Sequence, residues 1–94
     1  MLEKVYRHNP DTVFREIAGE FILVPIHHKA GEADSIYVLN KMGTRIWELV
    51  DGKRTLTDIV SMISAEYEVD YKIAADDLIE YVNEMIASGT LLEV

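Results

Sequence analysis

The sequence lacks cysteine altogether and has only two prolines among its 94 residues. A chain without cysteine can form neither disulfides nor a metal site built on thiolates. This composition suits a reducing compartment, so we expect a cytoplasmic protein. No segment approaches the roughly 20 apolar residues of a membrane-spanning helix, and residues 1–10 lack the apolar stretch of a signal peptide. We therefore expect no membrane partner.

Basic residues are scarce, because nine Lys and Arg oppose 17 Asp and Glu and give a net charge of −8. The excess lies in residues 51–94, which hold ten acidic side chains and three basic ones. Affinity for nucleic acid depends mainly on basic side chains that contact phosphates. The charge therefore argues against DNA or RNA as a partner.

Motifs with catalytic chemistry are missing as well. There is no glycine-rich phosphate loop and no nucleophile elbow. His27 and His28 are adjacent, and neighbouring residues of an extended segment point to opposite sides, so one metal ion rarely binds both. Glu80 and Glu84 have the spacing of a solvated helix face. We predict no enzyme, no catalytic residue, no metal site and no cofactor.

What the chain does contain is enough apolar material for a core, since 49% of its residues are hydrophobic. We expect a single domain over residues 1–94, with residues 1–11 as a loose N-terminal arm in which His8 is exposed. Short segments rich in β-branched and aromatic residues predict strands at 12–17, 20–26 and 35–39. The polar residues between the last two read as a loop.

After Asn40 the apolar residues recur with the period of a helix. Asn40 is a good N-cap for the first helix. The Asp51-Gly52 pair is typical of a β-hairpin, but its flanks have a helical period, so we predict that Gly52 ends the helix as its C′ residue. Thr55, with Asp58 three residues later, resembles a capping box and predicts the start of a second helix.

A third helix is predicted over residues 71–88, with Asp70 as its cap and Gly89 as its stop. Residues 90–94 then form a short strand or a tail. The fold class is α+β, with a three-stranded antiparallel sheet followed by three helices.

This third helix carries a wider apolar arc than a core-facing stripe needs, about 160° against roughly 100°. Ala75, Ile79 and Ile86 extend the arc beyond the core stripe of Ala74, Leu78, Tyr81, Val82 and Met85. Two interpretations remain open. Either the helix is buried on two sides, or these residues form one wall of a groove that takes a peptide beside a sheet edge.

Together these patterns resemble the family of the pyrroloquinoline quinone (PQQ) biosynthesis protein D, PqqD, over residues 14–94. Its domain is also called the RiPP recognition element, where RiPP denotes a ribosomally made and modified peptide. The resemblance is carried by an ordered set of positions: Asn40, Gly43, Ile46, Trp47, Asp51, Gly52, Arg54, Thr55, Gly89, Leu91 and Leu92.

The resemblance implies a winged-helix-like fold without catalysis. Such domains bind the leader of a precursor peptide by strand addition and present it to a modifying enzyme, often a radical S-adenosylmethionine (SAM) enzyme. Members dedicated to PQQ usually carry Pro-Glu after the second strand, whereas here Ile26 follows Pro25. The pathway is therefore that of PQQ or of another RiPP.

Carried over by position, the leader would pair with residues 35–39 and pack on the third helix. The predicted peptide-binding residues are Ser35, Ile36, Tyr37, Val38, Leu39, Lys72, Ala75, Asp76, Ile79, Asn83 and Ile86. Two other hypotheses stay open: a winged-helix DNA-binding regulator, and a structural subunit of an enzyme complex. The four acids and single lysine of the third helix weigh against the regulator.

Overall fold

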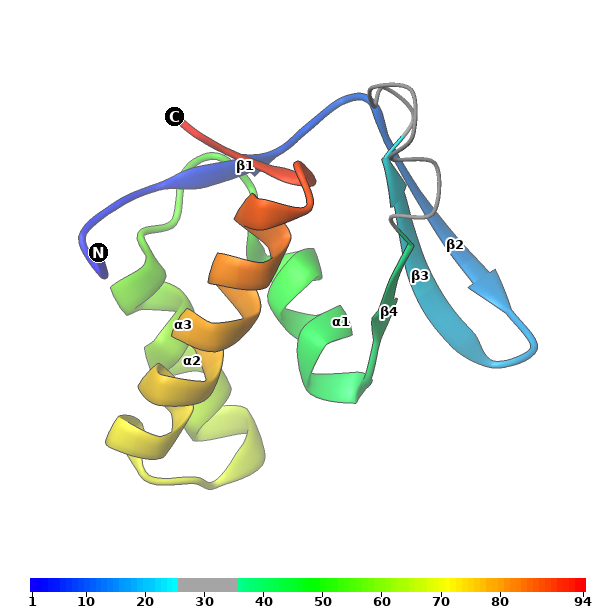
Figure 1. The fold of residues 1–94 in the computed structure, drawn as a ribbon. Coiled ribbons are helices and arrows are strands. Elements are labelled where there is room, and N and C mark those ends of the chain that lie inside the picture. Colours follow the sequence, from blue (N-terminus) through cyan, green and yellow to red (C-terminus); the bar gives the residue numbers. More distant parts are fainter. Residues whose placement is uncertain (26–35) are drawn as a thin grey trace.

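Three helices and a three-stranded sheet dominate the computed structural model, which describes residues 1–25 and 36–94 (Figure 1). In chain order the elements are β1 (Tyr6–His8), β2 (Thr12–Ile17), β3 (Glu20–Pro25), β4 (Tyr37–Leu39), α1 (Lys41–Leu49), α2 (Leu56–Tyr67), α3 (Tyr71–Ala87) and β5 (Leu91–Glu93). The predicted α+β class, a three-stranded antiparallel sheet followed by three helices, is confirmed. Residues 26–35, including the predicted ends of two strands and the His27-His28 pair, lie outside the described residues.

The sheet has the antiparallel order β2-β3-β4. Ala18 and Gly19 form the turn between β2 and β3, both with positive φ (53° and 84°), which suits a two-residue hairpin turn. Side chains alternate between two environments, as the period of two predicts. Leu23 and Leu39 are buried on the face that meets the helices, whereas Val38 is 57% exposed.

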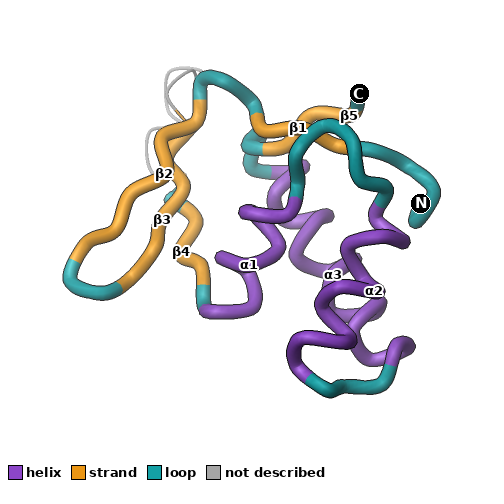
Figure 2. Tube along the Cα trace, turned by 180° about the vertical axis from the view of Figure 1, so that it is seen from behind, coloured by secondary structure: helices purple, strands orange, loops and turns teal. Residues whose placement is uncertain are grey.

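The core lies where α1 is held between the sheet and the pair formed by α2 and α3, as front and back views both show (Figure 1 and Figure 2). Its largest fully buried side chains come from the sheet, the helices and β5: Leu23, Ile46, Leu56, Ile59, Ile63, Leu78, Met85 and Leu91. Within the two described ranges, no helix is long and apolar enough to cross a bilayer.

The start of α2 matches its predicted capping residues, whereas Asp70 precedes α3 without a side-chain cap bond and the end of α1 differs from the prediction. Thr55 and Asp58 form a complete capping box, with two hydrogen bonds of 3.1 Å between their side chains and backbone N–H groups. Gly52 has a φ of +79°, but α1 already ends at Leu49, so Gly52 belongs to the interhelix turn and is not the C′ residue. The carboxylate of Asp51 tightens that turn by accepting two backbone hydrogen bonds.

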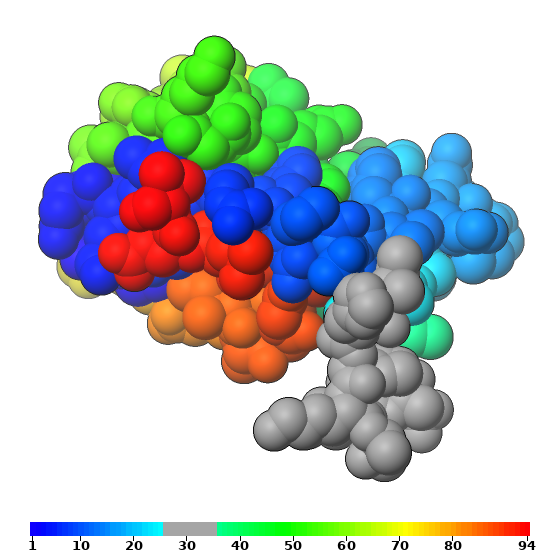
Figure 3. All heavy atoms as spheres, turned by 90° about the horizontal axis from the view of Figure 1, so that it is seen from above, coloured from blue at the N-terminus to red at the C-terminus, as the bar shows by residue number. Residues whose placement is uncertain are grey.

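The N-terminal residues are not a loose arm, contrary to our expectation. β1 pairs antiparallel with β5, and Figure 3 shows the two chain ends side by side across the top of the molecule. Backbone bonds continue to the helices, because Gly52 N–H donates to the carbonyl of Tyr6 and Leu56 N–H to that of Lys4. The side chain of Tyr6 is 6% exposed and belongs to the core.

We expected His8 to be exposed, but it is half-buried. Its ring stacks on that of Trp47 with 3.6 Å between centroids and an interplanar angle of 2°. Its Nε2 lies 2.7 Å from the carbonyl oxygen of Trp47. Because a carbonyl only accepts, Nε2 must carry the hydrogen. His8 therefore satisfies one of the free carbonyls at the C-terminal end of α1.

We predict that Tyr6→Ala lowers the free energy of unfolding by about 2–4 kcal/mol, because it removes a buried aromatic ring from the core. Arg7→Ala on the same strand is the control, since Arg7 is exposed and its loss should change stability by no more than about 0.5 kcal/mol. Urea denaturation measures both. Equal, small effects would mean that the N-terminal strand is detached from the core in solution.

Candidate functional site

An open hollow of about 1140 Å³ is bordered by β4, the β2–β3 turn with the start of β3, α1, the end of α2 and one flank of α3. Side chains from segments far apart in sequence meet there. Its lining residues are Gly19, Glu20, Phe21, Tyr37, Val38, Leu39, Asn40, Lys41, Met42, Thr44, Arg45, Glu48, Tyr67, Asp77, Glu80, Tyr81 and Glu84.

β4 is an edge strand of this sheet, because within the described residues it pairs only with β3. An edge strand presents N–H and C=O groups along its free side. The side chains of β4 and of Ile36 just before it fall into two sets: Tyr37 is half-buried and Leu39 buried, whereas Ile36 and Val38 are 56% and 57% exposed. The predicted binding set included residues from both faces of this strand, and the structure places Tyr37 and Leu39 on the side of the core.

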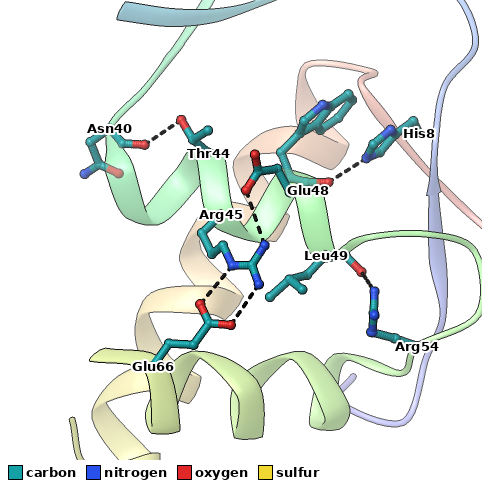
Figure 4. Close-up of polar contacts among 9 residues, drawn as sticks. His8, Asn40, Thr44, Arg45, Glu48, Leu49, Arg54 and Glu66 are labelled. Atoms are coloured by element: carbon teal, nitrogen blue, oxygen red, sulfur yellow. Dashed lines mark hydrogen bonds and ion pairs between the residues drawn. The ribbon is translucent and has the colours of Figure 1, made fainter. Parts of the chain in front are cut away.

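The end of β4 is tied to the start of α1 through Asn40. Its Oδ1 accepts a hydrogen bond of 2.8 Å from Gly43 N–H, while its carbonyl accepts one of 2.9 Å from the Thr44 hydroxyl (Figure 4 shows Asn40 and Thr44). A Cβ on Gly43 would lie 3.1 Å from Tyr81 and 3.2 Å from Leu39. Glycine at this position therefore lets α3 and β4 approach the first turn of α1.

Tyr37 connects β4 directly to α3 across the hollow. Its hydroxyl donates a hydrogen bond to the carboxylate of Glu84, which lies 47 residues further along the chain. Partial burial, and next the Glu84 carboxylate, raise the pKa of Tyr37 well above its usual value of 10.0. The neutral phenol is thus the form that the folded protein favours.

Arg45 joins α1 to α2 at another border of the hollow. Its Nε and a terminal nitrogen each lie 2.8 Å from a carboxylate oxygen of Glu66, and Glu48 lies within 3.4 Å (Figure 4). These hydrogen bonds raise the pKa of Arg45 and lower the pKa of Glu66. The positive charge of Arg45 is therefore already matched by carboxylates.

The predicted binding residues divide into two groups. Tyr37, Val38 and Leu39 line the hollow and Ile36 lies beside them, while Ser35 falls outside the described residues. None of the predicted residues of α3 lines it: Lys72, Ala75, Asp76, Ile79, Asn83 and Ile86. Ala75 is buried, whereas Lys72 and Asp76 form an exposed ion pair at 3.5 Å. A role for these six residues in binding stays a prediction.

The flank of α3 that borders the hollow carries Asp77, Glu80, Tyr81 and Glu84. At 100° per residue it lies on the other side of the core stripe from Ile79. From the sequence these acids had the pattern of a solvated face and Tyr81 that of a core residue. Tyr81 was the one residue whose sequence position could have indicated this flank. A tyrosine at the border of an apolar stripe needs solvent or a polar partner for its hydroxyl.

Metal ligands do not gather in the part of the chain that the structure describes. No three His, Cys, Asp or Glu side chains form a group there that could hold an ion. The hollow offers backbone groups of an edge strand, apolar surface and carboxylates. This combination can bind an extended chain.

Comparisons with known proteins add to this geometry. The sequence model of the family described as coenzyme PQQ synthesis protein D (PqqD) matches residues 20–91, which include β3, β4 and all three helices. No curated protein matches the sequence significantly. The fold resembles a solved structure described as TbiB1 in complex with the TbiA(beta) leader peptide. The TM-score is 0.72 at 25% sequence identity, over 90% of this chain and 93% of that chain.

We predict that Tyr37→Phe costs about 1 kcal/mol of stability near neutral pH, through loss of the hydrogen bond to Glu84. The pKa of Tyr37 is higher in the folded state than in the unfolded state, so its protonated hydroxyl contributes its full stabilisation below about pH 10. That contribution declines as pH rises further. The free energies of unfolding of wild type and variant should therefore converge in alkaline solution.

Urea denaturation at several pH values tests this prediction. Tyr67→Phe is the control, because Tyr67 also lines the hollow but its hydroxyl has no hydrogen bond among the described residues. Parallel curves for wild type and Tyr37→Phe up to strongly alkaline pH would contradict it.

Proposed function

The chain belongs to the PqqD family, and from that premise we propose that it binds the leader of a ribosomally made precursor peptide. The observation that carries the proposal is the hollow beside β4, which is an edge strand among the described residues, in a fold that resembles TbiB1 with its leader peptide. The chain would then present the leader to a modifying enzyme.

Strand addition to β4 is the mode of capture that this geometry supports. An extended leader can pair with the free backbone groups of β4, and its alternate side chains then point toward opposite faces of the sheet. Those on the inner face enter the hollow next to Tyr37 and face Tyr81 and the acids of α3. Those on the outer face lie beside Ile36 and Val38, which provide exposed apolar surface.

We assign the α3 wall of the site to the flank with Asp77 and Tyr81, because this flank borders the hollow. The flank with Ile79 and Ile86 remains the alternative, since Ile86 is 39% exposed. The two flanks make different predictions in the experiment below.

The proposed role is non-catalytic. The leader is held while the rest of the precursor reaches the active site of the modifying enzyme, which raises its effective concentration there. We propose a radical SAM enzyme as that partner, in the PQQ pathway or in another RiPP pathway. The family membership supports this assignment.

Titration of isotope-labelled protein with the leader of the precursor encoded beside its gene tests the proposal. We expect amide shifts in residues 36–39 and around Asp77, Tyr81 and Glu84, with smaller shifts around Ile79 and Ile86. The absence of shifts in residues 36–39 would contradict strand addition to β4. Shifts centred on Ile79 would favour the alternative flank of α3 as the wall of the site.

Methylation of leader backbone nitrogens tests the pairing itself. Strand addition places alternate N–H groups toward β4, so methylation at every second position should weaken binding by about tenfold per lost hydrogen bond. The intervening positions serve as the matched control and should tolerate methylation. Uniform tolerance along the leader, measured by fluorescence anisotropy, would contradict pairing with β4.

A further inference from the structure

The hollow has an unbalanced charge. Its lining includes five carboxylates, from Glu20, Glu48, Asp77, Glu80 and Glu84, against Lys41 and Arg45. Arg45 is held by Glu66 and Glu48, so it adds little free positive charge. Within residues 1–25 and 36–94, no ion pair involves Asp77 or Glu80. The site therefore presents negative charge to whatever it binds.

The acids of α3 form a row along the hollow. Asp77, Glu80 and Glu84 follow at i, i+3 and i+7, so the row is about 10 Å long at 1.5 Å per residue. Successive inward side chains of an added strand are about 6.7 Å apart. Glu80 and Glu84 are about 6 Å apart along the helix. This distance is close to the spacing of two leader side chains that point inward and are separated by one residue. Long, flexible Lys and Arg side chains accommodate the remaining difference.

We infer that the leader bound by this chain carries basic side chains at alternate positions, on the face that turns toward Asp77, Glu80 and Glu84 of α3. This inference rests on the proposed strand addition to β4 and adds the charge of the ligand. Negative charge focused in a hollow also attracts a basic peptide from a distance, and the net charge of −8 acts in the same direction. An acidic leader would meet uncompensated repulsion at the same row.

Short synthetic peptides of defined composition test the charge separately from the pairing. Three peptides alternate threonine with lysine, glutamine or glutamate, and their binding is followed by fluorescence anisotropy and amide shifts. Binding of the glutamine peptide along β4 reports on strand addition alone. We expect the lysine peptide to bind about tenfold more tightly than the glutamine peptide, and the glutamate peptide to bind most weakly.

Two exposed acids provide a matched pair of variants. Asp77 lines the hollow, whereas Glu3 lies in the N-terminal segment outside it, so Asp77→Lys and Glu3→Lys change the net charge equally. We expect Asp77→Lys to weaken binding of the lysine peptide by about three- to tenfold, and Glu3→Lys by less than about twofold. Added salt should reduce the difference between peptides.

Several outcomes would overturn the inference. Equal affinities of the three peptides for β4 would leave strand addition intact and remove the charge selectivity. If both variants weakened binding of the lysine peptide equally, the selectivity would come from the overall charge of the protein and not from the row of acids on α3. Binding of the lysine peptide away from the hollow, or no binding of any of the three peptides, would also contradict the inference. The leader titration described above tests strand addition independently of this charge selectivity.

Discussion

The junction of β4 and α1 determines how the rest of the structure is arranged. Asn40 ends the strand and caps the helix within a single residue, so the direction of α1 relative to the sheet is fixed at that point. Gly43 then leaves room for Tyr81 and Leu39 to meet over the first helical turn. A Cβ there would press on the side chains of Tyr81 and Leu39, which would have to shift by a few tenths of an ångström at the border of the hollow. The family positions Asn40 and Gly43 thus have a physical reason in the geometry of the site.

Local signals in the sequence predicted the sheet and the three helices, because each has its own period, turn or cap. The start of α2 depends on contacts between Thr55 and Asp58, which are three residues apart, and such short-range contacts can be predicted from a sequence. β1 was missed because its stability comes from β5, more than 80 residues away, and from the backbone bonds of Lys4 and Tyr6 to the start of α2 and the preceding turn. A three-residue strand has too short a pattern to be recognised without its partner.

The candidate site was predictable only in part for a related reason. A helical wheel gives the angle between residues of α3, but it does not say which angle points toward β4. Two tertiary contacts decide this, namely the approach of Tyr81 to Gly43 and the hydrogen bond from Tyr37 to Glu84. The apolar excess at Ala75, Ile79 and Ile86 drew attention to the opposite flank. β4 itself was located correctly because the order of strand, cap and helix is a local feature.

The acids of α3 also bear on how β4 can persist as an edge strand. An edge beside exposed Ile36 and Val38, with one side unpaired among the described residues, invites pairing with a second copy of the chain. Two copies joined through β4 would bring two acid-lined hollows together, and their like charges repel. A basic peptide meets no such repulsion. The same row of Asp77, Glu80 and Glu84 would thus oppose self-association and suit the basic ligand that we infer, which would leave the edge available for the peptide that the site is proposed to bind.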